Sequence, residues 1–214
     1  MAYDLEEQEQ IDTLKSWWKQ YGNLLTWLLI AALAAFSGWS AWNYYQRSQA
    51  AQAGQLYDEI GRAVVAKDKD KVLRGAADMR DRFGRTAYAE MAALLAAKIA
   101  FDGNDLNAAK TQLQWIVDKG HGDEYRALAR IRLAGVLLDE KAYEEGLKVL
   151  SGEVPAAFAG AVADRRGDLL MAQNKVAEAR TAYQEALKKS DAKSPGRQLI
   201  QLKLDAIGGA NPAA

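Results

Sequence analysis

Residues 22–42 of this chain read GNLLTWLLIAALAAFSGWSAW, and no Asp, Glu, Lys or Arg occurs between Lys19 and Arg47. A helix of that length spans roughly 31 Å at about 1.5 Å per residue, which matches the ~30 Å hydrocarbon layer of a bilayer. One central Lys or Asp would cost about 3 kcal/mol, most of the roughly 2–4 kcal/mol that the Leu, Ile and Phe side chains contribute to insertion. The absence of charge therefore predicts a transmembrane helix in the lipid bilayer over residues 20–46.

Aromatic residues gather at both ends of this span. Trp and Tyr side chains favour the headgroup level of a membrane, so two groups about one bilayer apart are typical of interfacial belts. The expected interface residues are Trp17, Trp18, Tyr21 and Trp27 at one end, and Trp39, Trp42, Tyr44 and Tyr45 at the other. A buried core helix is the alternative, and it does not account for aromatic rings at both ends of a charge-free segment.

A cleaved signal peptide is the sharper alternative, because Ala32-Leu33-Ala34 resembles a cleavage site. The segment before the span is acidic, however, whereas a signal peptide begins with positive charge. The pattern favours an uncleaved anchor preceded by a short N-terminal arm, residues 1–19. Basic residues are balanced on the two sides of the span, so charge alone does not orient it.

Composition argues against several classes of function. The 214 residues include 28 Lys+Arg and 28 Asp+Glu, and a nucleic-acid binder is expected to show a basic excess. Cysteine is absent and the single histidine is His121, so neither a zinc site nor a cysteine nucleophile is expected. No Gly-rich phosphate loop is present. We therefore expect no catalytic residue, no metal and no cofactor, and we do not expect an enzyme.

Beyond Arg47 the chain becomes polar but keeps a helical period. Apolar residues three and four apart predict a helix over Gln46–Val65 and a second helix over Asp70–Arg82. The pattern allows the first of these helices to be continuous with the transmembrane span. We interpret residues 47–84 as a helical connector or a degenerate repeat.

Three consecutive segments then resemble one another: Tyr88–Glu124, Tyr125–Ala157 and Phe158–Ser194. Their lengths are close to the ~34 residues of a tetratricopeptide repeat, whose paired helices pack closely only where small residues lie at the crossing. Residues of suitable size recur at the motif positions, namely Ala97, Ala100, Ala109, Leu113 and Ile116, then Ala134, Leu137, Gly146 and Leu150, then Gly167, Leu170, Ala179, Tyr183 and Ala186.

The predicted fold class is therefore all-α, with a single N-terminal transmembrane helix followed by a tetratricopeptide-like helical-hairpin solenoid over residues 85–207. Arg197–Ile207 predicts a terminal capping helix, and residues 208–214 a frayed tail.

The first helix of each pair lines the inner groove of such an array. Projecting the motif onto this chain gives candidate groove residues Met91, Leu94, Lys98 and Phe101, then Leu128, Ile131, Gly135 and Leu138, then Ala161, Asp164, Asp168 and Met171. Met and Phe side chains suit an adaptable apolar surface for peptides or partner helices. The alternative is that several of these side chains belong to the core and face the next hairpin.

The order of acidic arm, single span and repeats resembles the YfgM-like ancillary subunits of the Sec translocon, which are inner-membrane proteins of Gram-negative bacteria. The stretches that carry the resemblance are Gly38-Trp39 with Trp42-Asn43, Tyr88–Val117, Ala163–Asp168 and Ala177–Arg180. The resemblance implies a cytoplasmic N-terminus and a periplasmic repeat domain. It also implies association with the Sec translocon channel and with a membrane-anchored periplasmic chaperone of the prolyl-isomerase type, and a role in handing exported unfolded proteins to chaperones.

Two further hypotheses stay open. The same architecture would suit an anchored assembly factor of another envelope pathway, such as cytochrome maturation. A membrane-tethered enzyme is the third hypothesis, and it predicts a pocket of ionisable groups with perturbed pKa values.

Overall fold

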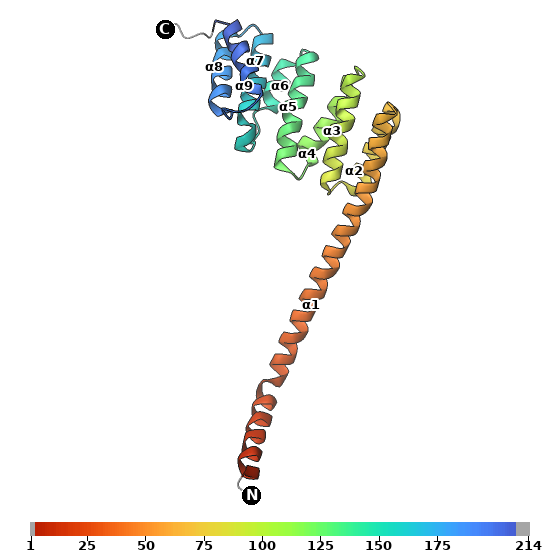
Figure 1. The fold of residues 1–214 in the computed structure, drawn as a ribbon, viewed down its shortest axis with the longest axis vertical. Helices are drawn as coiled ribbons and strands as arrows, with labels where there is room; N and C mark the ends of the chain where they lie inside the picture. The colour runs from red at the N-terminus through yellow and green to blue at the C-terminus, as the bar shows by residue number, and fades with distance from the viewer. Residues whose placement is uncertain (1–2, 209–214) are drawn as a thin grey trace. The chain divides into compact units, whose positions relative to one another are not determined.

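The computed structural model describes residues 3–208. Within them the chain forms nine α-helices, one short 3₁₀ helix and no strand (Figure 1), which confirms the all-α class. The elements are α1 (Tyr3–Val65), α2 (Lys69–Phe83), α3 (Ala87–Asp102), α4 (Leu106–Lys119), α5 (Asp123–Asp139), α6 (Tyr143–Val149), η1 (Ala156–Phe158), α7 (Ala159–Ala172), α8 (Val176–Lys189) and α9 (Gly196–Ala206). Apart from Gly208, the tail predicted over residues 208–214 lies outside the described residues.

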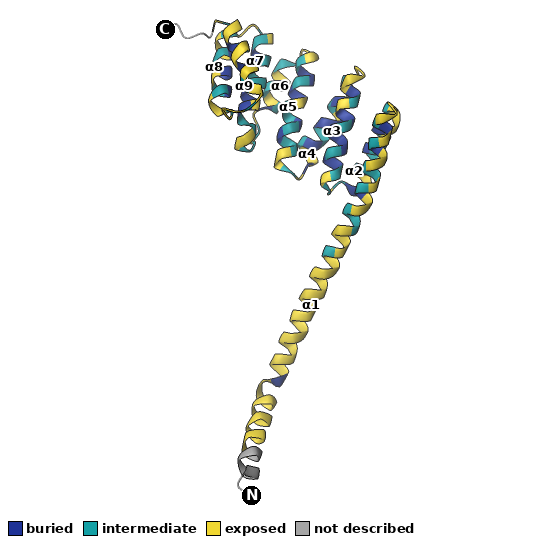
Figure 2. Cartoon of the chain, viewed as in Figure 1, coloured by how far each residue is buried: buried dark blue, intermediate teal, exposed yellow. Residues whose placement is uncertain are grey.

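The chain divides into two compact units, Met1–Gln49 and Ala50–Ala214. The described residues of the first unit, 3–49, all belong to the single helix α1. The most apolar window of α1 has a mean hydropathy of 1.7 and is entirely unburied. Figure 2 shows this stretch of α1 as almost uniformly exposed. Because unburied apolar surface is unfavourable in water, its length and composition make α1 a candidate membrane span, as the sequence predicts.

The aromatic side chains predicted for the two interfaces are all exposed on α1. They are Trp17, Trp18, Tyr21, Trp27, Trp39, Trp42, Tyr44 and Tyr45. Each ring is therefore available to the headgroup region of a membrane, which is the placement that interfacial belts require.

Four hairpins of the second unit close with the same turn. The turn residues adopt a left-handed backbone, with φ between 55° and 61°, and they are Lys67, Asn104, Lys141 and Asn174. In each case the next residue donates its backbone N–H to the carbonyl five residues earlier, as Asp105 does to Ala100 at 2.8 Å. This is the Schellman pattern of helix C-termini. The end of α1 and α2 thus form a hairpin of the same kind as α3–α4, α5–α6 and α7–α8.

Small residues allow the paired helices to approach closely. All fourteen motif positions predicted from the sequence are buried. A Cβ atom added at Gly146 would lie only 2.9 Å from Leu169 Cδ2, so the α6–α7 contact leaves no room for a side chain there. The burial of these positions supports the tetratricopeptide-like assignment.

Hydrophobic clusters form in succession along the second unit. The first joins the end of α1 with α2 and α3, the second joins α3 to α5, the third joins α5 to α7, and the last joins α7 to α9. Each hairpin therefore buries its apolar surface against its neighbours, as repeat arrays require. The predicted capping helix is present as α9, where Ile200 and Leu204 complete the last cluster.

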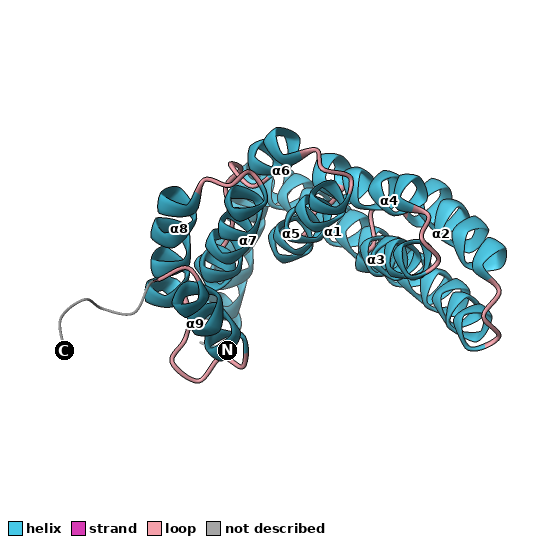
Figure 3. Ribbon diagram, turned by 90° about the horizontal axis from the view of Figure 1, so that it is seen from above, coloured by secondary structure: helices cyan, strands magenta, loops and turns pink. Residues whose placement is uncertain are grey.

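Viewed from above, the hairpins of the second unit follow an arc (Figure 3). The first helices of the pairs, α3, α5 and α7, lie on the inner side of the arc, and α4, α6 and α8 lie on the outer side. The inner side is therefore the face on which to look for a binding site.

Candidate functional site

A groove of about 370 Å³ opens on the inner side of the arc. Its lining comes from α3, α4, α5 and α7, and consists of Ala97, Lys98, Phe101, Leu113, Arg132, Gly135, Val136, Asp139 and Arg165. The groove therefore spans three successive repeats and is lined by both apolar and charged side chains.

Three of the predicted groove residues line this groove: Lys98, Phe101 and Gly135. Several others pack in or against the hydrophobic clusters between helices, namely Leu94, Leu128, Ile131, Leu138 and Met171. Met91 is half-buried on α3 and Ala161 is exposed on α7, and neither lines the groove. The groove is consequently more polar than the motif projection predicts.

The motif projection does not include the charged lining residues Arg132, Asp139 and Arg165. Arg132 and Asp139 are exposed on α5, and no ion pair to either is present among the described residues. A signal for both exists in the sequence, because Arg132 and Asp139 lie three residues before and four residues after Gly135. Such spacings place all three residues on one face of a helix.

Arg165 reaches across from α7 to α5. Its guanidinium carbon lies 3.6 Å from the point where a Cβ atom of Gly135 would stand. Its Nη1 donates to Asp168 Oδ2 at 3.2 Å, while its Nε is buried without a hydrogen-bond partner. The guanidinium is thus held against α5 at the edge of the groove by packing and by one ion pair.

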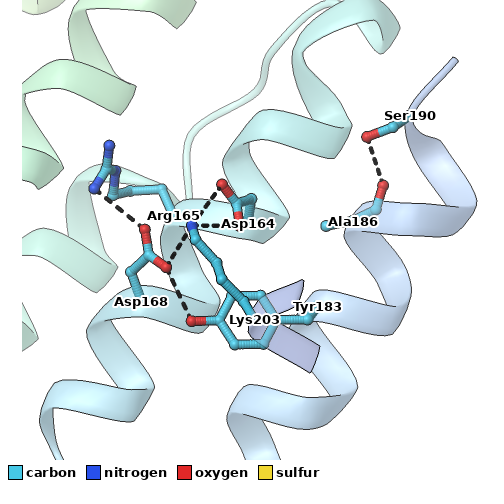
Figure 4. Close-up of polar contacts among 7 residues, drawn as sticks. All are labelled: Asp164, Arg165, Asp168, Tyr183, Ala186, Ser190 and Lys203. Atoms are coloured by element: carbon cyan, nitrogen blue, oxygen red, sulfur yellow. Dashed lines mark hydrogen bonds and ion pairs between the residues drawn. The ribbon is translucent and has the colours of Figure 1, made fainter. Parts of the chain in front are cut away.

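The predicted residues Asp164 and Asp168 do not line the groove and belong to a polar cluster between α7, α8 and α9, to which Arg165 is joined through Asp168 (Figure 4). Lys203 Nζ, on α9, lies 2.8 Å from Asp164 Oδ1 and 2.8 Å from Asp168 Oδ1. The Tyr183 hydroxyl donates to Asp168 Oδ1 at 2.9 Å, and Lys203 Nζ stands 5.6 Å from the centre of the Tyr183 ring. The cluster therefore fastens the capping helix to the last hairpin.

Burial controls the electrostatics of this cluster. It raises the pKa of Asp164; the hydrogen bond from Lys203 opposes this rise and the charge of Asp168 adds to it. Burial also raises the pKa of Tyr183, assisted by the charge of Asp168, so the phenol stays protonated and keeps donating. Lys203 is therefore the cation on which the ionised form of Asp164 depends.

Replacing Lys203 with methionine is expected to loosen α9. The change leaves two half-buried carboxylates, Asp164 and Asp168, without their shared cation, which costs about 1–3 kcal/mol in the local opening free energy at neutral pH. Hydrogen exchange of α8 and α9 in the full chain, measured by mass spectrometry, reports this loss. Lys188→Met on the exposed face of α8 is the matched control, and it should leave exchange unchanged.

The destabilisation that Lys203→Met causes should become smaller as the pH falls. Because the pKa of Asp164 is raised in the folded state, its contribution to stability is fully present below the unfolded value of about 3.9 and is lost as pH rises through the folded value. A protonated Asp164 needs no cation, so the difference between Lys203→Met and the parent should shrink on acidification toward that window. A difference that grows on acidification would contradict this account.

A buried carboxylate holds the connection between the first two repeats. Glu90 on α3 is 3% exposed and accepts the backbone N–H groups of His121 at 2.5 Å and Gly122 at 2.9 Å. The His121 side chain itself is exposed. Among the described residues no group of three or more His, Asp or Glu side chains is arranged to hold a metal ion. Glu90 is therefore best understood as a structural acceptor for the α4–α5 loop.

An apolar, unburied N-terminal helix and a series of hairpins with Schellman turns define a membrane-anchored protein of tetratricopeptide repeat-like fold. A family model described as a tetratricopeptide repeat-like domain matches residues 15–209. The chain is 32% identical over 208 residues to the ancillary SecYEG translocon subunit of Neisseria gonorrhoeae, covering 97% of this chain and 100% of that protein. The chain belongs to the family of ancillary SecYEG translocon subunits.

Other relatives carry the same name. The ancillary SecYEG translocon subunit of Haemophilus influenzae is 26% identical over 205 residues, covering 96% of this chain and 99% of that protein. The one from Aggregatibacter actinomycetemcomitans is 27% identical over 209 residues, with the same two coverages. The likeness therefore extends over the anchor and the repeats together, which is consistent with an inner-membrane protein.

Proposed function

We propose that this chain is a membrane-anchored interaction scaffold that associates with the Sec translocon and a membrane-anchored periplasmic chaperone. In this role it assists the transfer of exported unfolded proteins to chaperones and catalyses no reaction. The observation that carries the proposal is the full-length likeness to an ancillary SecYEG translocon subunit, at 32% identity over 97% of the chain. The groove on the inner side of the repeats supports it, because a concave surface on stacked hairpins is the usual binding face of such arrays.

The proposal includes a direction across the membrane. The N-terminal arm, residues 1–19, is cytoplasmic, residues 20–46 span the inner membrane, and the repeat domain, residues 85–207, is periplasmic. This orientation rests on the family resemblance, since the basic residues flanking the span are balanced. The Schellman turn at Lys67 favours assigning residues 47–84 as a degenerate repeat rather than a plain connector.

A photoreactive amino acid at Phe101 is expected to crosslink to partners in intact membranes. Phe101 is 42% exposed and lines the groove, so a probe there meets whatever the groove receives. The same probe at Lys188, exposed on the outer helix α8, is the control for chance encounters. We expect adducts with the translocon channel, a periplasmic chaperone or exported chains at position 101, identified by mass spectrometry, and at least several-fold fewer at position 188.

Two results would contradict the proposal. The first is the absence of any such adduct from Phe101 and from a second probe at Lys98, which lines the groove on the same helix. The second is a set of adducts confined to components of another envelope pathway, which would instead favour an assembly factor of that pathway. A chaperone adduct that is periplasmic would in addition support the proposed orientation of the repeats.

A further inference from the structure

Two arginines from neighbouring repeats line the same groove. Arg132 lies on α5 and Arg165 on α7, and both belong to the groove lining. Arg132 is exposed with no ion pair among the described residues, and Arg165 has a partner described only for Nη1. The third cation of the lining, Lys98, is already paired with Asp102 at 2.5 Å. Arg132 is therefore the unpaired positive charge of the lining, and Arg165 adds the N–H groups that Asp168 does not occupy.

We propose that this groove binds an acidic segment of a partner protein, with a glutamate or aspartate side chain on Arg132 and Arg165 and a neighbouring apolar side chain on Phe101. The inference rests on the proposed function, because the partner is one that this scaffold meets at the membrane. It adds to that function the chemistry by which the groove selects a segment.

The guanidinium groups are suited to a carboxylate. Each is planar, always charged, and offers paired N–H donors that match the two oxygens of a carboxylate. Arg165 is already fixed in place, because it lies over α5 at Gly135 and is tied to Asp168. A side chain that is held before binding loses less conformational freedom on binding. Arg165 thus provides a preorganised donor, and the exposed Arg132 can close on the ligand beside it.

The absence of a side chain at Gly135 makes room for the Arg165 guanidinium at this site. Gly135 lies between Arg132 and Asp139 on the same face of α5, and all three line the groove. A larger residue there would displace the Arg165 guanidinium, whose carbon lies 3.6 Å from the position of a Cβ atom. The glycine therefore lets the Arg165 guanidinium lie directly over α5, on the helix that carries Arg132.

Phe101 supplies the apolar part of the site. It is one of the few large apolar side chains of the second unit that are exposed, at 42%. It shares the groove with Ala97 on α3 and Val136 on α5. Exposed aromatic rings beside arginines are characteristic of the energetically important centres of interfaces. An apolar side chain next to the carboxylate would cover this ring.

Asp139 makes the two ends of the groove differ in charge. It lines the groove as the single acidic residue, seven positions after Arg132 on α5. A carboxylate near it is repelled, so an acidic segment must place its charge toward the Arg132 end. Neutralising Asp139 should therefore strengthen the binding of acidic segments, an effect that a purely structural residue would not produce.

Fluorescence anisotropy on the full chain in nanodiscs of zwitterionic lipid tests the inference. The probe is a short fluorescein-labelled peptide with two glutamates next to a Leu-Phe pair, blocked at both ends, and the matched probe has glutamines in place of the glutamates. We expect the glutamate peptide to bind about tenfold more tightly, as one charge-assisted contact implies. We also expect its binding to weaken with added salt.

Variants locate the effect. Arg132→Glu should weaken binding of the glutamate peptide about tenfold, and Phe101→Ala should weaken binding of both peptides. Asp139→Asn should tighten binding of the glutamate peptide several-fold. Arg74→Glu makes the same charge change at an exposed position on α2 and should change nothing. Equal affinity for the two peptides, or no response to Arg132→Glu in a chain whose hydrogen exchange matches the parent, would overturn the inference.

The same variants separate this inference from the proposed function. The nanodisc measurement contains no translocon, so it reports the groove alone, whereas co-purification of the channel from membranes reports the association. Equal affinity of the parent chain for the two peptides, with the channel still co-purifying, overturns the groove inference only. A glutamate preference that follows Arg132 and Asp139 supports the groove inference even where the channel fails to co-purify.

Discussion

Replacing Gly167 with valine is expected to disrupt the packing of α7 on α8 and to lower the free energy of unfolding of the repeat unit by roughly 3 kcal/mol or more. A Cβ atom at position 167 would overlap the ring of Tyr183, at 2.6 Å from Cδ1 and 2.9 Å from Cζ. Such separations are far inside van der Waals contact, so either the helices move apart or the ring leaves its place. Valine adds two further methyl groups to that overlap.

Moving the Tyr183 ring out of its position would cost much free energy. It is 3% exposed and packs with Leu170 and Ile200 in the cluster that joins the last hairpin to the capping helix. Its hydroxyl donates to Asp168 and its ring faces Lys203. A displaced ring would therefore break the polar cluster as well as the apolar packing, and the two losses would fall on the same three helices.

Pulse proteolysis of the full chain in detergent across a urea series measures the change. Gly61→Ala, in the part of α1 that belongs to the repeat unit, is the control, because nothing lies within 4 Å of a Cβ atom there. That substitution should stabilise the chain by about 0.5–1 kcal/mol, since alanine favours a helix interior over glycine. The two changes at helical glycines should thus have opposite signs. Equal stability of Gly167→Val and the parent would show that the hairpin does not need the close approach.

Much of the fold follows from local patterns in the sequence. The span is predicted because few structures besides a transmembrane helix accommodate a charge-free apolar run of bilayer length. The hairpins are predicted because small residues recur with the repeat, as at Ala97, Gly146 and Gly167, and each of these positions is buried. Asn104 and Asn174 suit the turns in which they lie, because asparagine tolerates a left-handed backbone.

At Lys67 and Lys141 the sequence indicates a break between helices but not the backbone conformation of the turn. Lysine does not favour a left-handed backbone, yet both residues have φ above 50° and close the same Schellman pattern. The packing of the surrounding helices imposes that conformation, and this packing cannot be predicted from the residues of a single segment. The degenerate first hairpin is hard to recognise for this reason.

The candidate site is only partly predictable from the sequence. The motif projection finds Phe101, Lys98 and Gly135, since these positions follow from the helix period. It does not find Arg165 as a groove residue, because that depends on a side chain crossing from one repeat to the next. Nor does it separate Asp164 from the groove, because its partner Lys203 lies 39 residues away on a helix whose docking the period does not determine.

Replacing Leu33 with lysine is expected to remove most of the chain from the membrane. Leu33 lies near the middle of the charge-free span and is exposed on α1. A central lysine costs about 3 kcal/mol and the lost leucine about 0.5 kcal/mol more, against roughly 2–4 kcal/mol of favourable insertion from all the large aliphatic and Phe side chains. The balance falls to about zero or becomes unfavourable, so a single charge should suffice.

Extraction of membranes at alkaline pH, followed by quantification of the chain in pellet and supernatant, measures the effect. Leu33→Ala removes only the leucine contribution and should leave the chain in the pellet. Gln46→Lys places the same charge at the edge of the span, where its stem reaches the headgroups, and should also be retained. Because both controls keep the aromatic belts at Trp17 and Trp42, they separate a central charge from any general loss of anchoring. Full retention of Leu33→Lys would mean that contacts with a partner helix, rather than lipid alone, hold α1 in the bilayer.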